Sequence, residues 1–142
     1  MTHQPTTIPT LGTTPTKAHP DDAGFDLYAS HSITIPSMGN TLVDTGVAIA
    51  LPPGMVADIR SRSGLAYKSQ VFVLNAPGTI DPGYTGPIKA NLMNLGRKPY
   101  TIQKGERVAQ LVFIQTAPVH LQPVTELPTT ARGQAGHGST GN

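Results

Sequence analysis

Glycine and proline interrupt this chain at short intervals, and that punctuation constrains its fold more than any other feature. The 142 residues include 15 glycines and 14 prolines. Glycine destabilises a helix interior, and proline removes a backbone donor and clashes with the preceding turn. Only Ser63–Ser69 has a pattern compatible with a helix. The sequence therefore excludes a helix bundle and predicts many short strands joined by turns.

Between the turn residues, apolar positions alternate with the period of two that is typical of half-buried strands. The alternation is clearest in Pro87–Asn94, where Ile88, Ala90, Leu92 and Asn94 share one face. Short strands in this number predict an all-β fold, a sandwich or barrel of the jelly-roll kind. The predicted strands are Gly24–Ala29, Ser32–Ile35, Thr41–Leu51, Met55–Arg60, Val71–Leu74, Pro87–Asn94, Tyr100–Gln103, Arg107–Gln115 and Val119–Val124.

Composition divides the chain into a β-domain and a tail. Residues 1–22 are rich in Thr and Pro and are expected to be extended, with one edge strand. Residues 128–142 hold one charged side chain, Arg132, and no aliphatic side chain larger than alanine. Such a tail buries too little apolar surface to order itself. We therefore expect one domain over residues 1–127 and a flexible C-terminal arm over residues 128–142.

Several classes of protein are excluded or disfavoured. The chain has no cysteine, so it has no disulfide framework and no thiol nucleophile. No apolar run is long enough to span a bilayer, and no secretory signal is visible, so the expectation is a cytoplasmic protein with no membrane partner. The net charge is +2 without a run of like charges, which argues against nucleic acid as a partner and is compatible with a small anionic ligand. With 5% aromatic residues the core is thin, and oligomerisation often completes such a core.

Two segments near the middle of the chain could carry chemistry. In Arg60–Ala66, two arginines stand beside the start of the predicted helix, where backbone N–H groups favour anions. Ser63 is a natural N-cap, and capping alone could explain it. In Asn75–Gly86, glycines and prolines predict a tightly bent hairpin that presents Asp81 and Tyr84. Asp81 could be a general base in a pocket, or its carboxylate could cap its own turn.

Three further positions are ambiguous when taken alone. Asp26 lies between Phe25 and Leu27 on a predicted strand, and it faces solvent if those two point inward. Gln110 places an amide in an apolar row, where it needs a backbone or ligand partner. The segment 132–141 could be a disordered linker, or a lid that closes over phosphate with arginine, histidine and hydroxyl groups.

Taken together and in order, these segments closely resemble one family, the homotrimeric deoxyuridine triphosphatases (dUTPases). The resemblance covers about residues 20–141, and the hairpin and the arm are its most specific parts. The matching segments are AGFDLYA (23–29), RSGLA (62–66), GTIDPGYTGPIKANLMN (78–94), RVAQLVF (107–113) and RGQAGHGSTG (132–141).

The resemblance implies a jelly-roll-like distorted β-barrel that assembles as a homotrimer, with the arm closing the active site of another subunit. The implied reaction is hydrolysis of dUTP to dUMP and pyrophosphate by in-line water attack on the α-phosphorus. This reaction keeps uracil out of DNA and supplies dUMP for dTMP synthesis. The implied cofactor is Mg²⁺, held mainly by the triphosphate, with Asp26 acting on the metal through water.

The resemblance also implies residue roles. Asp81 is the catalytic base, and Tyr84 packs beneath the deoxyribose and excludes a 2′-hydroxyl. The uracil edge is read by Asn75 and by the backbone of Gly78, Thr79 and Ile80. The remaining substrate-binding residues are Arg62, Ser63 and Gly64 in a phosphate-binding turn, Lys89 after the hairpin, Gln110 on a strand, and Arg132, His137, Gly138 and Ser139 in the arm.

Two alternatives stay open. A dCTP deaminase-like relative has the same barrel but needs a glutamate placed to act on the cytosine ring. The chain has only Glu106 and Glu126, and both lie outside the hairpin. A regulatory relative would use the barrel to bind a protein partner, as some phage proteins do. Three departures from the family pattern are His137 in place of the commoner Phe, Ala135 in a usual Gly pair, and Ser61 in place of Pro.

Overall fold

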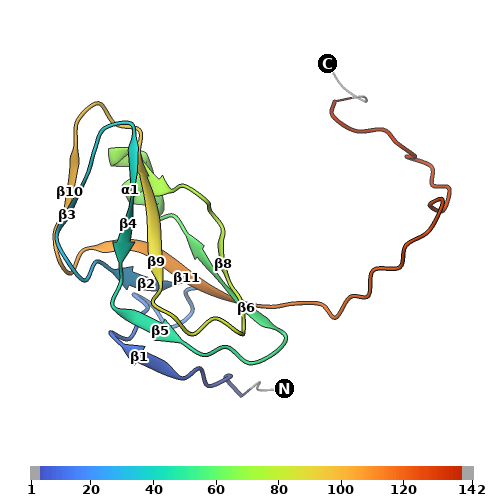
Figure 1. Ribbon diagram of the computed structural model, residues 1–142, viewed down its shortest axis with the longest axis horizontal. Helices are drawn as coiled ribbons and strands as arrows, with labels where there is room; N and C mark the ends of the chain where they lie inside the picture. Colours follow the sequence, from blue (N-terminus) through green and yellow to red (C-terminus); the bar gives the residue numbers. More distant parts are fainter. Residues whose placement is uncertain (1–3, 139–142) are drawn as a thin grey trace.

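A computed structural model describes residues 4–138, and over that range it is built almost entirely of short strands (Figure 1). Its one helix, α1 (Ser63–Ser69), ends at Gln70, which adopts the left-handed conformation with φ of 54°. The strands are β1 (Thr10–Gly12), β2 (Phe25–Tyr28), β3 (Ile33–Ile35), β4 (Gly39–Asp44), β5 (Val47–Ile49), β6 (Met55–Arg60), β7 (Val71–Val73), β8 (Gly78–Ile80), β9 (Lys89–Asn94), β10 (Tyr100–Ile102) and β11 (Arg107–Gln115).

The strands form small antiparallel sheets. One sheet has the order β2-β11-β6-β8 and a second has the order β4-β9-β7. Two strand pairs, β10-β3 and β1-β5, complete the architecture. Figure 1 shows β4 and β9 running side by side, and the chain after β11 leading away from the body. This arrangement confirms the predicted all-β class, including the edge strand in the N-terminal segment, which is β1.

The core consists of aliphatic side chains from the inward face of each strand. Ala90, Leu92 and Asn94 alternate as buried residues along β9, as the period of two predicts. No aromatic residue is among the buried hydrophobic residues of the described chain. Phe25 and Phe113 instead pack edge to face at the border of the core, with ring centroids 5.6 Å apart. The core is therefore thin, as the composition suggests.

Two strand predictions are wrong. Thr41–Leu51 is not one strand, because the chain turns at Thr45 and at Gly46, whose φ is 69°, and this turn divides β4 from β5. Val119–Val124 is not a strand, and its alternating side chains are open, with Val119 73% and Leu121 83% exposed. A strand needs a neighbour for its backbone groups, and no other part of residues 4–138 pairs with this segment.

Within the described range, no helix has the length and apolar character needed to cross a membrane.

Candidate functional site

The predicted hairpin residues line a single cavity of about 300 Å³. Strand β8 pairs with β6, with Gly78 opposite Ile59 and Ile80 opposite Ala57, and the chain then turns at Asp81. The N–H of Tyr84 donates to the Asp81 carbonyl oxygen at 3.1 Å and closes this turn. The cavity is lined by Ile59, Asn75, Gly78, Thr79, Ile80, Asp81, Tyr84, Pro87, Ile88 and Lys89.

The Asp81 side chain is exposed at this cavity. Its carboxylate has no hydrogen-bond or ion-pair partner within residues 4–138. The possibility that the carboxylate caps its own turn is therefore not realised, because backbone groups close the turn. A carboxylate without a protein partner keeps its lone pairs available for water or a substrate hydroxyl.

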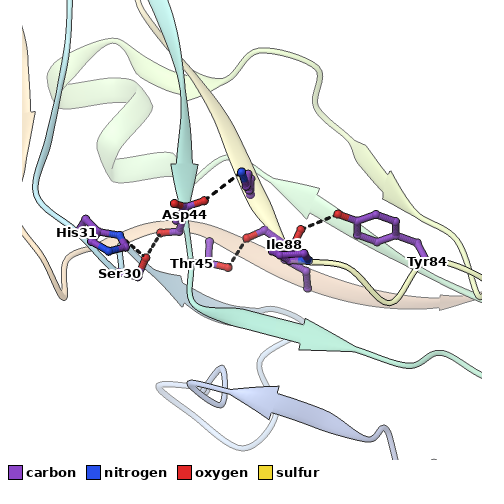
Figure 2. A network of polar contacts seen from close by, with 8 residues as sticks. Ser30, His31, Asp44, Thr45, Tyr84 and Ile88 are labelled. Carbon is purple, nitrogen blue, oxygen red and sulfur yellow. Dashed lines mark hydrogen bonds and ion pairs between the residues drawn. The ribbon is translucent and has the colours of Figure 1, made fainter.

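The Tyr84 ring is held in one orientation. Its hydroxyl donates to the Pro87 carbonyl oxygen at 2.7 Å, and Figure 2 shows the ring directed toward the segment that leads into β9. The ring lies against Gly86, where a Cβ atom would be 2.8 Å from the tyrosine hydroxyl oxygen and 2.9 Å from Cζ. Glycine at position 86 is therefore required by the close approach of the ring.

Strand β8 offers its backbone to the cavity. It is the last strand of the order β2-β11-β6-β8, so only one of its two edges is used by β6. An edge strand presents a row of free N–H and C=O groups. The Asn75 side chain lies beside it, since a Cβ at Gly78 would be 3.3 Å from Asn75 Nδ2. The hairpin resemblance implied these residues, but the sequence did not show that β8 is an edge.

A second group of predicted residues gathers where β2, β11 and the end of β6 meet. Gln110 on β11 lies opposite Asp26 on one side and Arg60 on the other. Its Nε2 donates to the Ser61 carbonyl oxygen at 3.0 Å, which gives the partly buried amide a backbone partner. A Cβ at Gly24 would be 2.3 Å from Gln110 Oε1, so glycine there makes room for the amide.

Charged residues surround this second group. The Asp26 carboxylate lies 3.7 Å from Arg107 Nη1, and its side chain is only 18% exposed. The sequence left the orientation of Asp26 open, and the structure places its side chain partly buried beside Arg107 on the neighbouring strand. Arg62 Nη1 donates to the Arg107 carbonyl oxygen at 3.1 Å, so Arg62 lies over the same strand.

The predicted cap at the start of α1 is also wrong. The N-cap is Arg62, its side chain makes no capping hydrogen bond, and Ser63 is the first helical residue. Ser63 and Gly64 are both exposed. Their exposure leaves the start of the helix accessible beside Arg62.

The arm stands apart from both groups (Figure 1). Arg132, His137 and Gly138 are exposed, and Arg132 Nε donates to the Ala135 carbonyl oxygen of the arm itself at 2.8 Å. Ser139 and Thr140 lie outside the described residues. One chain thus brings together the hairpin group and the Gln110 group on one sheet, but not the arm.

The two groups on the sheet both lie along β6. Gly78 is opposite Ile59 and Asp81 follows Ile80, which is opposite Ala57, whereas Gln110 is opposite Arg60 at the end of the strand. The described part of the arm does not bring Arg132 to either group in one chain.

Among the described residues, no group of three or more His, Asp or Glu side chains is placed to hold a metal ion. The second group contains one carboxylate, Asp26. Mg²⁺ in phosphate-processing sites commonly keeps several waters and is held by substrate phosphates with one or two carboxylates. The residues present fit that kind of site.

Comparisons with known proteins agree on one family. The family model for dUTPase matches residues 11–141. A deoxyuridine 5′-triphosphate nucleotidohydrolase of Crocosphaera subtropica is 47% identical, over 89% of this chain and 89% of its own length. The enzyme of the same name from Wolinella succinogenes is 50% identical, over 84% and 80%. The dUTPase of Staphylococcus bacteriophage 80alpha with dUpNHpp has a similar fold, with a TM-score of 0.88, 26% identity, and coverage of 96% of this chain and 99% of that one.

Proposed function

The chain belongs to the dUTPase family, and from that premise we propose which of its residues carry out the reaction. The reaction is hydrolysis of dUTP to dUMP and pyrophosphate. Asp81 is the general base that takes a proton from the water attacking the α-phosphorus. The observation that carries this assignment is an exposed carboxylate, without a protein partner, at a cavity lined by an edge strand.

Uracil is recognised by the free edge of β8 together with Asn75. The backbone donors and acceptors of a strand stand in a fixed order. A nucleobase whose donors and acceptors do not match that order therefore leaves polar groups unpaired. A site built to form hydrogen bonds rejects mismatched analogues by about 10⁴-fold or more. The residues that line the cavity include no glutamate, so the described chain offers no support for a dCTP deaminase-like reaction.

The deoxyribose packs on Tyr84, whose hydrogen bond to Pro87 and contact with Gly86 hold the ring in place. A ring in a fixed position leaves no room for a 2′-hydroxyl, and this excludes UTP. Lys89 lies at the same cavity and adds a polar contact, with its Nζ 3.5 Å from Asp44 Oδ1.

The phosphates bind the group around Gln110. Arg62 supplies a guanidinium, Ser63 and Gly64 supply the exposed start of α1, and Gln110 supplies an amide. When bound, Mg²⁺ neutralises charge on the triphosphate. Asp26, the one carboxylate of this group, would hold the ion through water. A structure of the phage phi11 dUTPase is described with a structural Mg(II) ion, which supports the presence of this metal in the family.

The active form is a homotrimer in which the arm of one subunit closes a site on another. The support is the separation of the arm from the rest of the site and the exposure of Val119, Leu121, Val124 and Leu127, which are 57–83% exposed in one chain. Residues 128–142 then act as the lid, with Arg132 on the phosphates, His137 stacked on uracil, and Gly138 and Ser139 nearby. The phage 80alpha dUTPase is described as controlling the transfer of virulence genes. A regulatory protein partner therefore stays a prediction for this chain. Its cytoplasmic location is a separate prediction.

Pyrophosphate release from dUTP, dCTP, dTTP and UTP tests the proposal in one experiment. We expect rapid release from dUTP and release from the other three lower by several orders of magnitude. Comparable release from dUTP and UTP would contradict the role of Tyr84. Formation of ammonia from dCTP would instead support the deaminase alternative.

A further inference from the structure

Thr45 is one of three polar or charged residues buried within residues 4–138, and it is 2% exposed. The other two have partners in other parts of the fold. Asp58 lies 3.3 Å from Arg60, and Asn94 Nδ2 donates to the Ile35 carbonyl oxygen on β3 and to the Lys98 carbonyl oxygen in the loop after β9. Thr45 lies at the turn between β4 and β5, and its hydroxyl bonds to the segment that follows the hairpin.

The hydroxyl of Thr45 reaches across to the segment that enters β9. Its Oγ1 donates to the Ile88 carbonyl oxygen at 2.6 Å, while the Thr45 N–H lies at a longer 3.4 Å from the same oxygen. The Ile88 N–H donates to the Val47 carbonyl oxygen at 2.8 Å. Thr45 in the turn and Val47 at the start of β5 therefore hold the peptide groups on the two sides of the Ile88 Cα. Figure 2 shows the bond from Thr45.

One of these two peptide groups also orients Tyr84. The carbonyl oxygen of Pro87 accepts the tyrosine hydroxyl at 2.7 Å, and it belongs to the same planar peptide as the Ile88 N–H. The Thr45 hydroxyl fixes the next peptide along the chain. A rotation about the Ile88 backbone would move the acceptor of Tyr84, and the buried hydrogen bond of Thr45 opposes that rotation.

We infer that Thr45 is a positioning residue for sugar selection. It holds the Ile88 carbonyl group and so limits rotation of the adjoining Pro87–Ile88 peptide. That peptide accepts the Tyr84 hydroxyl, and the ring excludes a 2′-hydroxyl. The inference rests on the proposed role of Tyr84. The nearby ion pair of Asp44 with Lys89 is a weaker anchor, because both side chains are about half exposed, at 48% and 47%.

The test compares kcat/KM for dUTP and UTP in Thr45→Val, which keeps the shape of the side chain but removes its hydroxyl. We expect the preference for dUTP over UTP to fall by about tenfold or more, since displacements near 1 Å can change rates about 10²-fold. The change should come mainly from faster use of UTP. Thr45→Ser, which keeps the hydroxyl, should retain the preference. Thr45→Ala serves as a second hydroxyl-free variant if the valine protein does not fold.

Asn94→Ala is the matched control. It removes buried hydrogen bonds at the other end of β9, far from Tyr84 along the strand. We expect it to lower the melting temperature, as we also expect of Thr45→Val, but to leave the dUTP preference unchanged. An unchanged preference in folded Thr45→Val or Thr45→Ala, or an equal loss in Asn94→Ala, would overturn the inference.

Tyr84→Ala separates failure of this inference from failure of the proposed function. If Tyr84→Ala loses the preference and the hydroxyl-free Thr45 variants do not, the inference alone fails. If Tyr84→Ala keeps the preference, the proposed role of Tyr84 fails and the inference fails with it.

Discussion

At the scale of single residues, the Asp81 carboxylate combines a lack of protein partners with a position at a cavity. Among the described residues, Asp26, Asp44 and Asp58 each lie within 4 Å of a cationic side chain. Asp81 instead lines a cavity of about 300 Å³ and lies in a turn closed by backbone groups. A carboxylate placed in this way has no visible structural task, which agrees with a chemical one.

Asp81→Asn should therefore remove turnover without removing binding. General-base catalysis contributes about 10²–10⁴-fold, so we expect kcat for dUTP to fall by at least that much, with nucleotide affinity within a few-fold of wild type. Pyrophosphate release and equilibrium binding measure the two effects separately. Near-normal turnover in this variant would contradict the assignment of Asp81 as the base.

Gly86 and Gly83 form a matched pair in the same hairpin. A Cβ at position 86 would lie 2.8–3.1 Å from three atoms of Tyr84, whereas a Cβ at position 83 would meet nothing within 4 Å. Gly86→Ala should push the ring off its hydrogen bond with Pro87 and raise use of UTP relative to dUTP. Gly83→Ala should leave the ratio of kcat/KM for UTP to that for dUTP unchanged. If this ratio were equal in the two variants, the position of the Tyr84 ring would not decide sugar selection.

At the scale of secondary-structure elements, the arm has a simple sequence, and we propose that it closes the active site. The described part of segment 116–138 has no helix or strand, and its side chains are nearly all exposed. Its internal contacts are local, such as the hydrogen bond from the Gly133 N–H to Thr130 Oγ1 at 3.0 Å. Within residues 4–138 the hydrogen bonds of the arm stay inside the arm, so the proposed lid role requires a surface of another subunit.

Removal of residues 131–142 should abolish most dUTP hydrolysis and leave the fold intact, because the described part of this segment, residues 131–138, contributes nothing to the buried core. Arg132→Ala should account for most of the loss in turnover, since arginines in this role contribute about 10³–10⁵-fold to phosphoryl transfer. His137→Phe should stay active, because aromatic stacking on a base is worth about 1–3 kcal/mol and survives the change. Arg97→Ala, which removes an exposed charge from the loop after β9, is the control. Unchanged turnover in the truncated protein would mean that the arm is a tail without function.

At the scale of the whole molecule, the distribution of site residues bears on assembly. The hairpin group and the Gln110 group both lie along β6, and the described part of the arm lies away from both. The interfaces of symmetric homo-oligomers repeat with the symmetry of the assembly. The proposed trimer would therefore contain three equivalent sites, each completed by residues from a neighbouring subunit.

Mixing two inactive variants tests whether the arm acts between subunits. We expect chains with Asp81→Asn and chains with Arg132→Ala to recover part of the wild-type activity when unfolded and refolded together. Mixed trimers contain sites in which an intact Asp81 from one chain meets an intact arm from another. Each variant refolded alone is the control and should stay inactive. If the arm acted only on its own chain, the mixture would stay inactive too, and sedimentation of an active monomer would contradict the trimer directly.

Local sequence patterns were sufficient for the fold class and for most of the strands. Two patterns depend only on neighbouring residues: the turn residues at short intervals, and the alternation of apolar and polar residues along each strand. They correctly predict an all-β chain with a buried face on β9. The family segments likewise identified the cavity-lining residues, because the hairpin is local in sequence.

Only the tertiary structure decided what depends on partners distant in the chain. Val119–Val124 has the alternation of a strand, yet it has no neighbour in one chain, because pairing requires a free edge within reach. Asp26 is covered by Arg107, and β8 is an edge, only because of how β2, β11, β6 and β8 are ordered in the sheet. The hydrogen bond from Thr45 to Ile88 joins residues 43 positions apart. Such contacts follow from packing, which local periodicity does not specify.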